Sequence, residues 1–180
     1  GVRLARIAGV DIIADWSLFV IFALVTVNLG WGVLPAWHPD WSPLVVWSVA
    51  LGAAVLFFAS VVAHELSHAL VARATGTEVN RITLFLFGGV AHLSRDPSTP
   101  KAELLMAAVG PLTSLVIGIA ATLAGGALAT NAVALFPDQP AVAFARLGPL
   151  TTLLLWLGPV NIVLALFNLI PGFPLDGGRV

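Results

Sequence analysis

The sequence predicts a polytopic α-helical membrane protein with a small membrane-associated β-hairpin between its second and third helices. Only 9% of the 180 residues are charged and 59% are hydrophobic, whereas soluble domains carry about 25% charged residues. A hydrocarbon core of about 30 Å requires roughly 20 residues of helix. Four apolar stretches are long enough, and the predicted membrane helices are residues 16–34, 44–74, 102–130 and 147–170.

The first stretch is interpreted as a membrane helix that the protein retains. Arg3 and Arg6 precede it, as basic residues precede the apolar part of a signal peptide. However, the run from Trp16 to Leu34 is longer than such a segment and does not end in an Ala-x-Ala pattern. The segment 35–43 that follows contains two tryptophans, which are typical of a membrane–water interface.

A β-hairpin is predicted between the second and third helices. Residues 79–87 are rich in β-branched and aromatic side chains, Gly88-Gly89 is typical of a turn, and a shorter apolar run ends at Leu93. Nine residues are too few to cross the membrane as a helix. We therefore expect the hairpin at the membrane surface or in a cavity lined by protein.

The distribution of basic residues predicts the orientation in the membrane. With four crossings, Arg146 lies on one side, and the other seven basic residues lie on the opposite side: Arg3, Arg6, Arg73, Arg81, Arg95, Lys101 and Arg179. By the positive-inside rule, the N-terminus and the hairpin are then cytoplasmic. Residue 64 is about 20 residues, or roughly 30 Å, beyond the outer start of its helix, which places it in the cytoplasmic half of the bilayer.

Composition also narrows the partners and the metal ligands. The net charge is −1 and there is no basic run, so no nucleic-acid partner is expected. The chain contains no cysteine, so any metal ion would need histidine and carboxylate ligands.

His64-Glu65-Leu66-Ser67-His68 is an H-E-x-x-H sequence within a predicted membrane helix. Residues four apart share a helix face, so both imidazoles can bind one zinc ion, and Glu65 is the base that a zinc hydrolase needs. The alternative is a pair of histidines that only satisfy hydrogen bonds. A His-Glu-His cluster is costly in lipid unless it is functional, which favours the metal site.

Catalytic zinc usually takes three protein ligands and a water molecule. Asp176 follows the fourth helix as the chain returns to the side of the histidine pair, so topology makes it a candidate. A turn aspartate before Gly177 explains it equally well. His38 is predicted on the opposite side of the membrane, and we interpret His92 as a polar residue at a strand end.

Together these motifs resemble the site-2 protease family of intramembrane zinc metalloproteases (peptidase family M50). The resemblance rests on the H-E-x-x-H sequence, on Gly110-Pro111, on residues 87–90 and above all on Asn168-x-x-Pro171-x-x-x-x-Asp176-Gly177. It implies that His64, His68 and Asp176 bind one zinc ion and that Glu65 is the catalytic base. It also implies that Asn168 helps to position the substrate or intermediate and that the hairpin at Gly88, Gly89 and Val90 receives an extended substrate.

The resemblance further implies an endopeptidase of the cell membrane that cleaves within or near the transmembrane segment of a single-pass protein, such as an anti-sigma factor or another membrane-tethered regulator. Residues 1–180 would be one intramembrane core domain, and the end just after the third-ligand motif suggests a truncated chain. A membrane protein that binds or transports zinc without proteolysis is the alternative. The sequence leaves the substrate and the oligomeric state open.

Overall fold

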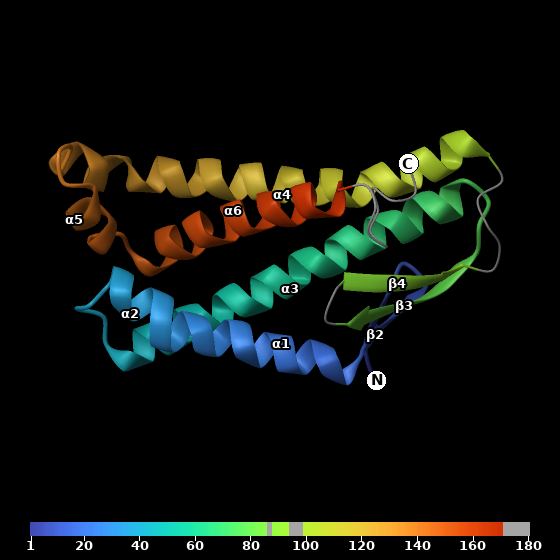
Figure 1. Cartoon of the computed structure of the whole chain (residues 1–180), viewed down its shortest axis with the longest axis horizontal. Coiled ribbons are helices and arrows are strands. Elements are labelled where there is room, and N and C mark those ends of the chain that lie inside the picture. The colour runs from blue at the N-terminus through green and yellow to red at the C-terminus, as the bar shows by residue number, and fades with distance from the viewer. Residues whose placement is uncertain (86–87, 94–98, 171–180) are drawn as a thin grey trace.

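The computed structural model describes residues 1–85, 88–93 and 99–170. In this part of the chain, four helical segments are long and apolar enough to cross a membrane: Trp16–Trp37, Pro43–Ala74, Pro100–Leu135 and Pro149–Asn168. A helix of sufficient length covers each of the four predicted stretches, and the third helix is longer than expected at both ends. Figure 1 shows these helices side by side, with a β-sheet at one end of the bundle and the short helix α5 (Pro140–Ala145) at the other.

The first span is built from three continuous segments, which are α1 (Trp16–Val27), a π-helical segment η1 (Asn28–Val33) and α2 (Leu34–Trp37). Helix α2 continues through Pro35, so the link to the next span is shorter than the predicted turn of residues 35–43. Gly30 in η1 lies against the ring of Trp47, where an added Cβ would be only 2.5 Å from a ring carbon. The π-helical segment therefore coincides with a close contact between the first and second spans.

The other three spans are single helices, α3 (Pro43–Ala74), α4 (Pro100–Leu135) and α6 (Pro149–Asn168). Each has proline in its first turn, where the missing N–H costs no hydrogen bond. The side chains of Ser42 and Thr99 cap α3 and α4 by accepting from Val45 N and Ala102 N. These start signals explain why the helix boundaries follow the sequence closely.

The sheet has four strands in the order β1-β2-β3-β4: β1 (Val2–Ile7), β2 (Val10–Ala14), β3 (Val79–Phe85) and β4 (Gly88–Leu93). Strands β3 and β4 are antiparallel and connect α3 to α4, whereas β2 pairs with β3 in parallel. The expectation of a sheet confined to the hairpin between the second and third helices was therefore incomplete. Half of the sheet precedes the first span.

The predicted turn at Gly88-Gly89 was wrong. Both glycines belong to β4, where Gly88 pairs with Phe85 and Gly89 pairs with Leu84. The connection between the strands is instead residues 86–87, which lie outside the described residues.

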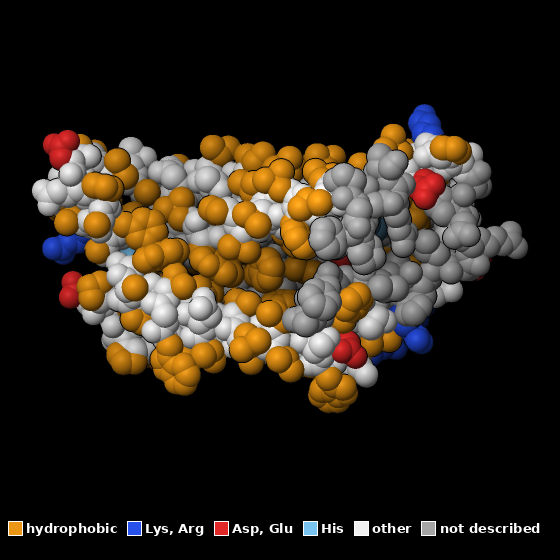
Figure 2. Space-filling view, in the orientation of Figure 1, with side chains coloured by type: hydrophobic (Ala, Val, Ile, Leu, Met, Phe, Trp, Pro, Cys, Tyr) orange, Lys and Arg blue, Asp and Glu red, His pale blue; other side chains and the backbone are white. Residues whose placement is uncertain are grey.

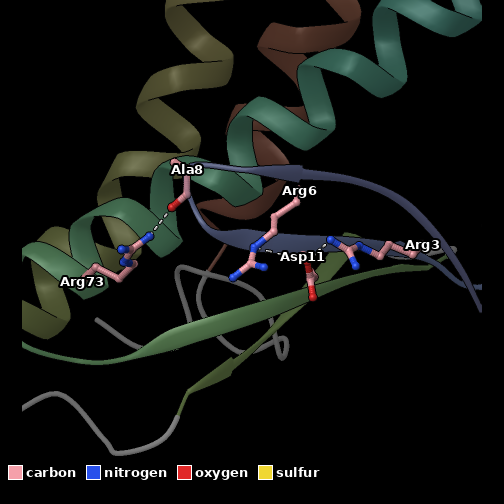
Figure 3. Close-up of polar contacts among 5 residues, drawn as sticks. All are labelled: Arg3, Arg6, Ala8, Asp11 and Arg73. Atoms are coloured by element: carbon pink, nitrogen blue, oxygen red, sulfur yellow. Dashed lines mark hydrogen bonds and ion pairs between the residues drawn. The ribbon is translucent and has the colours of Figure 1, made fainter.

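The N-terminal hairpin β1-β2 is attached to the end of α3 and stabilised by ion pairs (Figure 3). Arg73, in the last turn of α3, donates a hydrogen bond to the carbonyl of Ala8 at the tip of this hairpin. Within the hairpin, the Asp11 carboxylate lies 2.9 Å from the Arg3 guanidinium and 3.8 Å from that of Arg6. Asp11 thus has a structural role in this hairpin.

The sheet packs directly on the half of α3 that contains the H-E-x-x-H motif. A single buried cluster joins β2 and β3 to α3, and it includes Ile12, Ile82, Leu84, Val61 and Ala69. Apolar side chains on the outer faces of the helices remain exposed, for example Leu123 and Val163. Figure 2 shows a broad hydrophobic surface along one face of the bundle. This surface suits lipid, and the protein is a multi-pass membrane protein.

Candidate metal centre and catalytic carboxylate

The two histidines of the motif lie one helical turn apart on the face of α3 that packs against α4. Their Nε2 atoms face each other at 3.2 Å, and their rings are nearly perpendicular, with an angle of 70°. His64 is only 2% exposed. The predicted convergence of the two imidazoles is therefore present in the structure.

The opposite nitrogen of each ring is held by α4. The Nδ1 atom of His64 lies 2.9 Å from Ser114 Oγ, and that of His68 lies 2.5 Å from the carbonyl oxygen of Met106. A carbonyl can only accept, so Nδ1 of the neutral His68 ring carries the proton and its Nε2 presents a lone pair. Zinc-binding histidines are oriented in the same way, by a hydrogen bond from their second nitrogen.

The separation of the two Nε2 atoms fits a shared zinc ion. Zinc binds imidazole nitrogen at about 2.0–2.1 Å with tetrahedral angles, which places two such nitrogens about 3.3 Å apart. The observed 3.2 Å agrees with that value. The geometry and the nitrogen donors therefore suit zinc without rearrangement of α3.

Gly110 on α4 leaves the space beside this pair open. A Cβ at position 110 would stand 2.1 Å from Nε2 of His68 and 2.6 Å from Nε2 of His64. Any side chain would therefore enter the space between the two rings and displace them. In the sequence, Gly110-Pro111 contributes only to a family resemblance, because the steric role of Gly110 depends on the packing of α4 on α3.

Glu65 points to a different neighbour from the two histidines. It is half-buried, and its Oε1 accepts a hydrogen bond of 2.9 Å from the main-chain N–H of Gly89 in β4. The hairpin therefore lies directly over the carboxylate that the motif assigns as the base. This contact joins the H-E-x-x-H motif to the hairpin, two elements that are 24 residues apart in the sequence.

The predicted third ligand, Asp176, lies outside the described residues. Helix α6 leads to it and ends at Asn168, whose Nδ2 donates to the carbonyl oxygen of Leu164 at 2.9 Å. Among residues 1–85, 88–93 and 99–170, no third histidine or carboxylate forms a metal-binding group with the histidine pair. A third protein ligand from the region that follows α6 is compatible with this finding.

Other residues near the sheet have structural roles or are described only in part. Asp15 caps α1, and the hydrogen bond from Ser17 N lowers the pKa of the Asp15 carboxyl. The backbone of His92 pairs with Arg81 in β3, while its side chain lies outside what the structure describes. Val90 of β4 pairs with Thr83 of β3.

His38 lies at the far end of the bundle, where it joins three segments. It is buried, it stacks on Trp41, and its two ring nitrogens contact the carbonyl oxygen of Ala145 at 3.2 Å and Thr152 Oγ1 at 2.8 Å. Burial lowers the pKa of His38. Sequence reasoning placed His38 away from the metal site, and it found no signal for this structural role.

Comparison with known proteins agrees with this geometry. The sequence model of peptidase family M50 matches residues 52–136 and 131–180, which is most of the chain. The chain belongs to peptidase family M50, the site-2 protease family. The H-E-x-x-H motif and the region after α6 both lie within the matched residues.

Three relatives show the extent of the similarity. The chain is 42% identical over 179 residues to a Mycobacterium tuberculosis protein named "Putative zinc metalloprotease Rip3" and 32% identical to the zinc metalloprotease MJ0392 of Methanocaldococcus jannaschii. Each match covers 99% of this chain but only 42% and 44% of the relative, so the chain spans less than half of these proteins. The solved site-2 protease from Methanocaldococcus jannaschii has a TM-score of 0.62 and 31% identity, and the match covers 99% of this chain and 68% of that structure.

Proposed function

We propose that this chain is the catalytic part of a zinc-dependent intramembrane endopeptidase that hydrolyses a peptide bond within or near the transmembrane segment of a membrane-tethered protein. The observation that carries the proposal is the 3.2 Å separation between the Nε2 atoms of His64 and His68 on a helix long and apolar enough to span a membrane. Glu65 directly follows His64 in the sequence. The zinc metalloprotease names of the relatives support the choice of metal.

We assign His64 and His68 as two ligands of one zinc ion and Asp176 as the third. Zinc in such a site supplies Lewis acidity, which lowers the pKa of a water molecule to about 7 and polarises a carbonyl group. Ser114 and the Met106 carbonyl hold the two rings in orientation from α4. Glu65 accepts the proton of the attacking water and then delivers it to the leaving amine.

The substrate would reach the site as an extended strand, because a helix hides its peptide bonds in its own hydrogen bonds. Strand β4 is at one edge of the sheet, and this edge faces Glu65, since Gly89 N–H points to that carboxylate. Strand addition to such an edge is a common mode of peptide recognition. In this arrangement an unwound segment would pass beside Glu65 and the histidine pair.

The charged residues support an orientation with the N-terminus and the sheet in the cytoplasm. At the sheet end, the described residues include Arg3, Arg6, Arg73, Arg81 and Lys101, whereas Arg146 lies at the opposite end. The site would then be in the cytoplasmic half of the cell membrane. Membrane-tethered regulators of the anti-sigma factor type, which cross the membrane once, are the substrate class that we propose.

Zinc transport is less well supported. A transport route would require ligands that continue toward the far end of the bundle. His38 lies there, but hydrogen bonds engage both of its ring nitrogens.

A Glu65→Gln variant tests the proposed reaction. Glutamine retains nearly the same shape but cannot accept the proton, so cleavage of a co-expressed single-pass substrate should fall by about 10²- to 10⁴-fold while zinc content is retained. Glu103→Gln is the matched control, because Glu103 is an exposed carboxylate in the first turn of α4. Cleavage by Glu65→Gln at the rate of the control would refute the proposal.

A further inference from the structure

Strand β4 is at the edge of the sheet formed by the described residues, and it presents the main-chain N–H of Gly89 to Glu65. In an antiparallel pair, successive residues direct their N–H and C=O groups alternately toward the partner strand and away from it. Gly89 N–H donates to Glu65 Oε1 at 2.9 Å, so the backbone groups of Gly89 point away from β3. The same alternation directs the backbone of Val90 toward Thr83 and that of Ala91 outward. Val90 is therefore not an outward-facing edge position.

The Glu65 side chain occupies the place of a partner strand at position 89. An added strand would run about 4.7–4.9 Å from β4, whereas Glu65 Oε1 is already 2.9 Å from the Gly89 nitrogen. A substrate strand cannot use this donor while Glu65 holds it. The next outward N–H along the edge belongs to Ala91.

Position 89 also lacks space for any side chain. A Cβ on Gly89 would stand 2.4 Å from Cδ of Glu65 and 2.7 Å from its Oε2. These atoms form the carboxylate itself, so a methyl group would displace the reactive end of Glu65. The hydrogen bond and the absence of a Cβ together fix where the carboxylate lies.

We propose that Gly89 is the positioning residue of Glu65. Its main-chain N–H holds one carboxylate oxygen and thereby orients the other for proton transfer, while Ala91 offers the first edge donor to the substrate. This division of the β4 edge rests on the proposed protease function. Gly89 thus acts on the base and Ala91 acts on substrate binding.

The contact can be tested without any cleavage. Hydrogen exchange of the Gly89 amide is measured by NMR in ¹⁵N-glycine-labelled protein, where the Gly89 signal is the one absent from a Gly89→Ala sample. Glu65→Ala removes the acceptor and should accelerate exchange at least about tenfold, whereas Glu65→Gln retains an acceptor oxygen and should preserve protection. Equal exchange in the wild type and in Glu65→Ala would overturn the proposal, and this outcome is independent of whether the chain is a protease.

The consequence for catalysis is tested by two changes at position 89. Replacement of Gly89 by glycolic acid converts the amide to an ester, which removes the N–H and adds no side chain. We expect kcat to fall about 10- to 100-fold with this ester and about 100-fold with Gly89→Ala, because small displacements of a catalytic group are costly. KM and zinc content should change less than about threefold.

Ala91→Pro and Gly126→Ala are the matched controls. Proline at position 91 removes the N–H of Ala91, which is the next outward-facing donor after that of Gly89. Ala91→Pro should therefore raise KM while kcat is retained. None of the described atoms lies within 4 Å of a Cβ at Gly126, so Gly126→Ala should leave both constants unchanged. If the ester raises KM and leaves kcat unchanged, Gly89 acts in substrate binding. If the ester variant loses its zinc, Gly89 acts at the metal site. Either result overturns the proposal. If the wild type cleaves no substrate, the proposed function fails, while the exchange measurement still decides on the contact.

Discussion

Replacement of Gly110 by alanine should abolish tight zinc binding. The new Cβ would lie 2.1 Å from His68 Nε2 and 2.6 Å from His64 Nε2, whereas ordinary contacts begin at 3.4 Å. The two nitrogens would have to retreat by about 1.3 Å and 0.8 Å, but zinc sites tolerate deviations of only about 0.2 Å in ligand distances.

The size of the effect follows from the displacement of both rings. Changes in the groups that merely orient ligands cost about 10- to 100-fold in metal affinity. Displacement of the ligands themselves should cost at least about 100-fold, or about 2.7 kcal/mol of binding free energy. The helix should remain intact, because alanine is a better helix former than glycine by about 0.5–1 kcal/mol.

Competition with a fluorescent zinc chelator at pH 7 in detergent measures this change in affinity. Gly126→Ala is the control, since it adds the same methyl group to α4 at a position with no atom of residues 1–85, 88–93 or 99–170 within 4 Å. Circular dichroism should show equal helix content in both variants. Equal zinc affinity of Gly110→Ala and Gly126→Ala would refute the account of the site.

Two further predictions concern His64 and His38. Ser114→Ala removes the hydroxyl 2.9 Å from His64 Nδ1, so zinc affinity in the same chelator assay should fall about 10- to 100-fold. Thr113→Ala should leave the affinity unchanged, because the Thr113 hydroxyl donates to Val109 O in its own helix. Equal affinities of the two variants would contradict the orienting role of Ser114. Burial lowers the pKa of His38 from 6.5, so the unfolded state binds this proton more readily and the free energy of unfolding should fall as the pH drops below about 6.5. Melting temperatures measured between pH 8 and pH 5 should therefore fall more steeply for the wild type than for His38→Phe, and parallel curves would show that His38 is not responsible.

The membrane helices could be predicted closely because their signals are local. Length and apolar composition identify each span, and proline in the first turn marks where three of them begin, two of which also have a capping side chain. Strand β1 gave no comparable signal. Arg3 and Arg6 interrupt its apolar residues, and most of its side chains remain exposed, so the sequence lacks the alternation of a half-buried strand.

The candidate site could be predicted only where it is continuous in sequence. One helix turn joins His64 and His68, whereas Ser114 and Met106 are 50 and 38 residues away from the rings that they contact. The wrong prediction of a turn at Gly88-Gly89 has a similar origin. Two adjacent glycines usually indicate a turn, but here Gly89 is required in a strand because Glu65 approaches its backbone. Such a requirement appears only when α3 and β4 pack together.

The most direct test of the metal site is zinc content per chain, measured by elemental analysis of purified wild type, His68→Ala and Asp176→Ala. The account predicts one zinc ion per wild-type chain and loss of most of the zinc from both variants, because each removes one of three ligands. Glu65→Gln should retain its zinc and serves as the control. Full zinc occupancy in His68→Ala would contradict the assignment of the histidine pair, and full occupancy in Asp176→Ala alone would contradict the assignment of the third ligand.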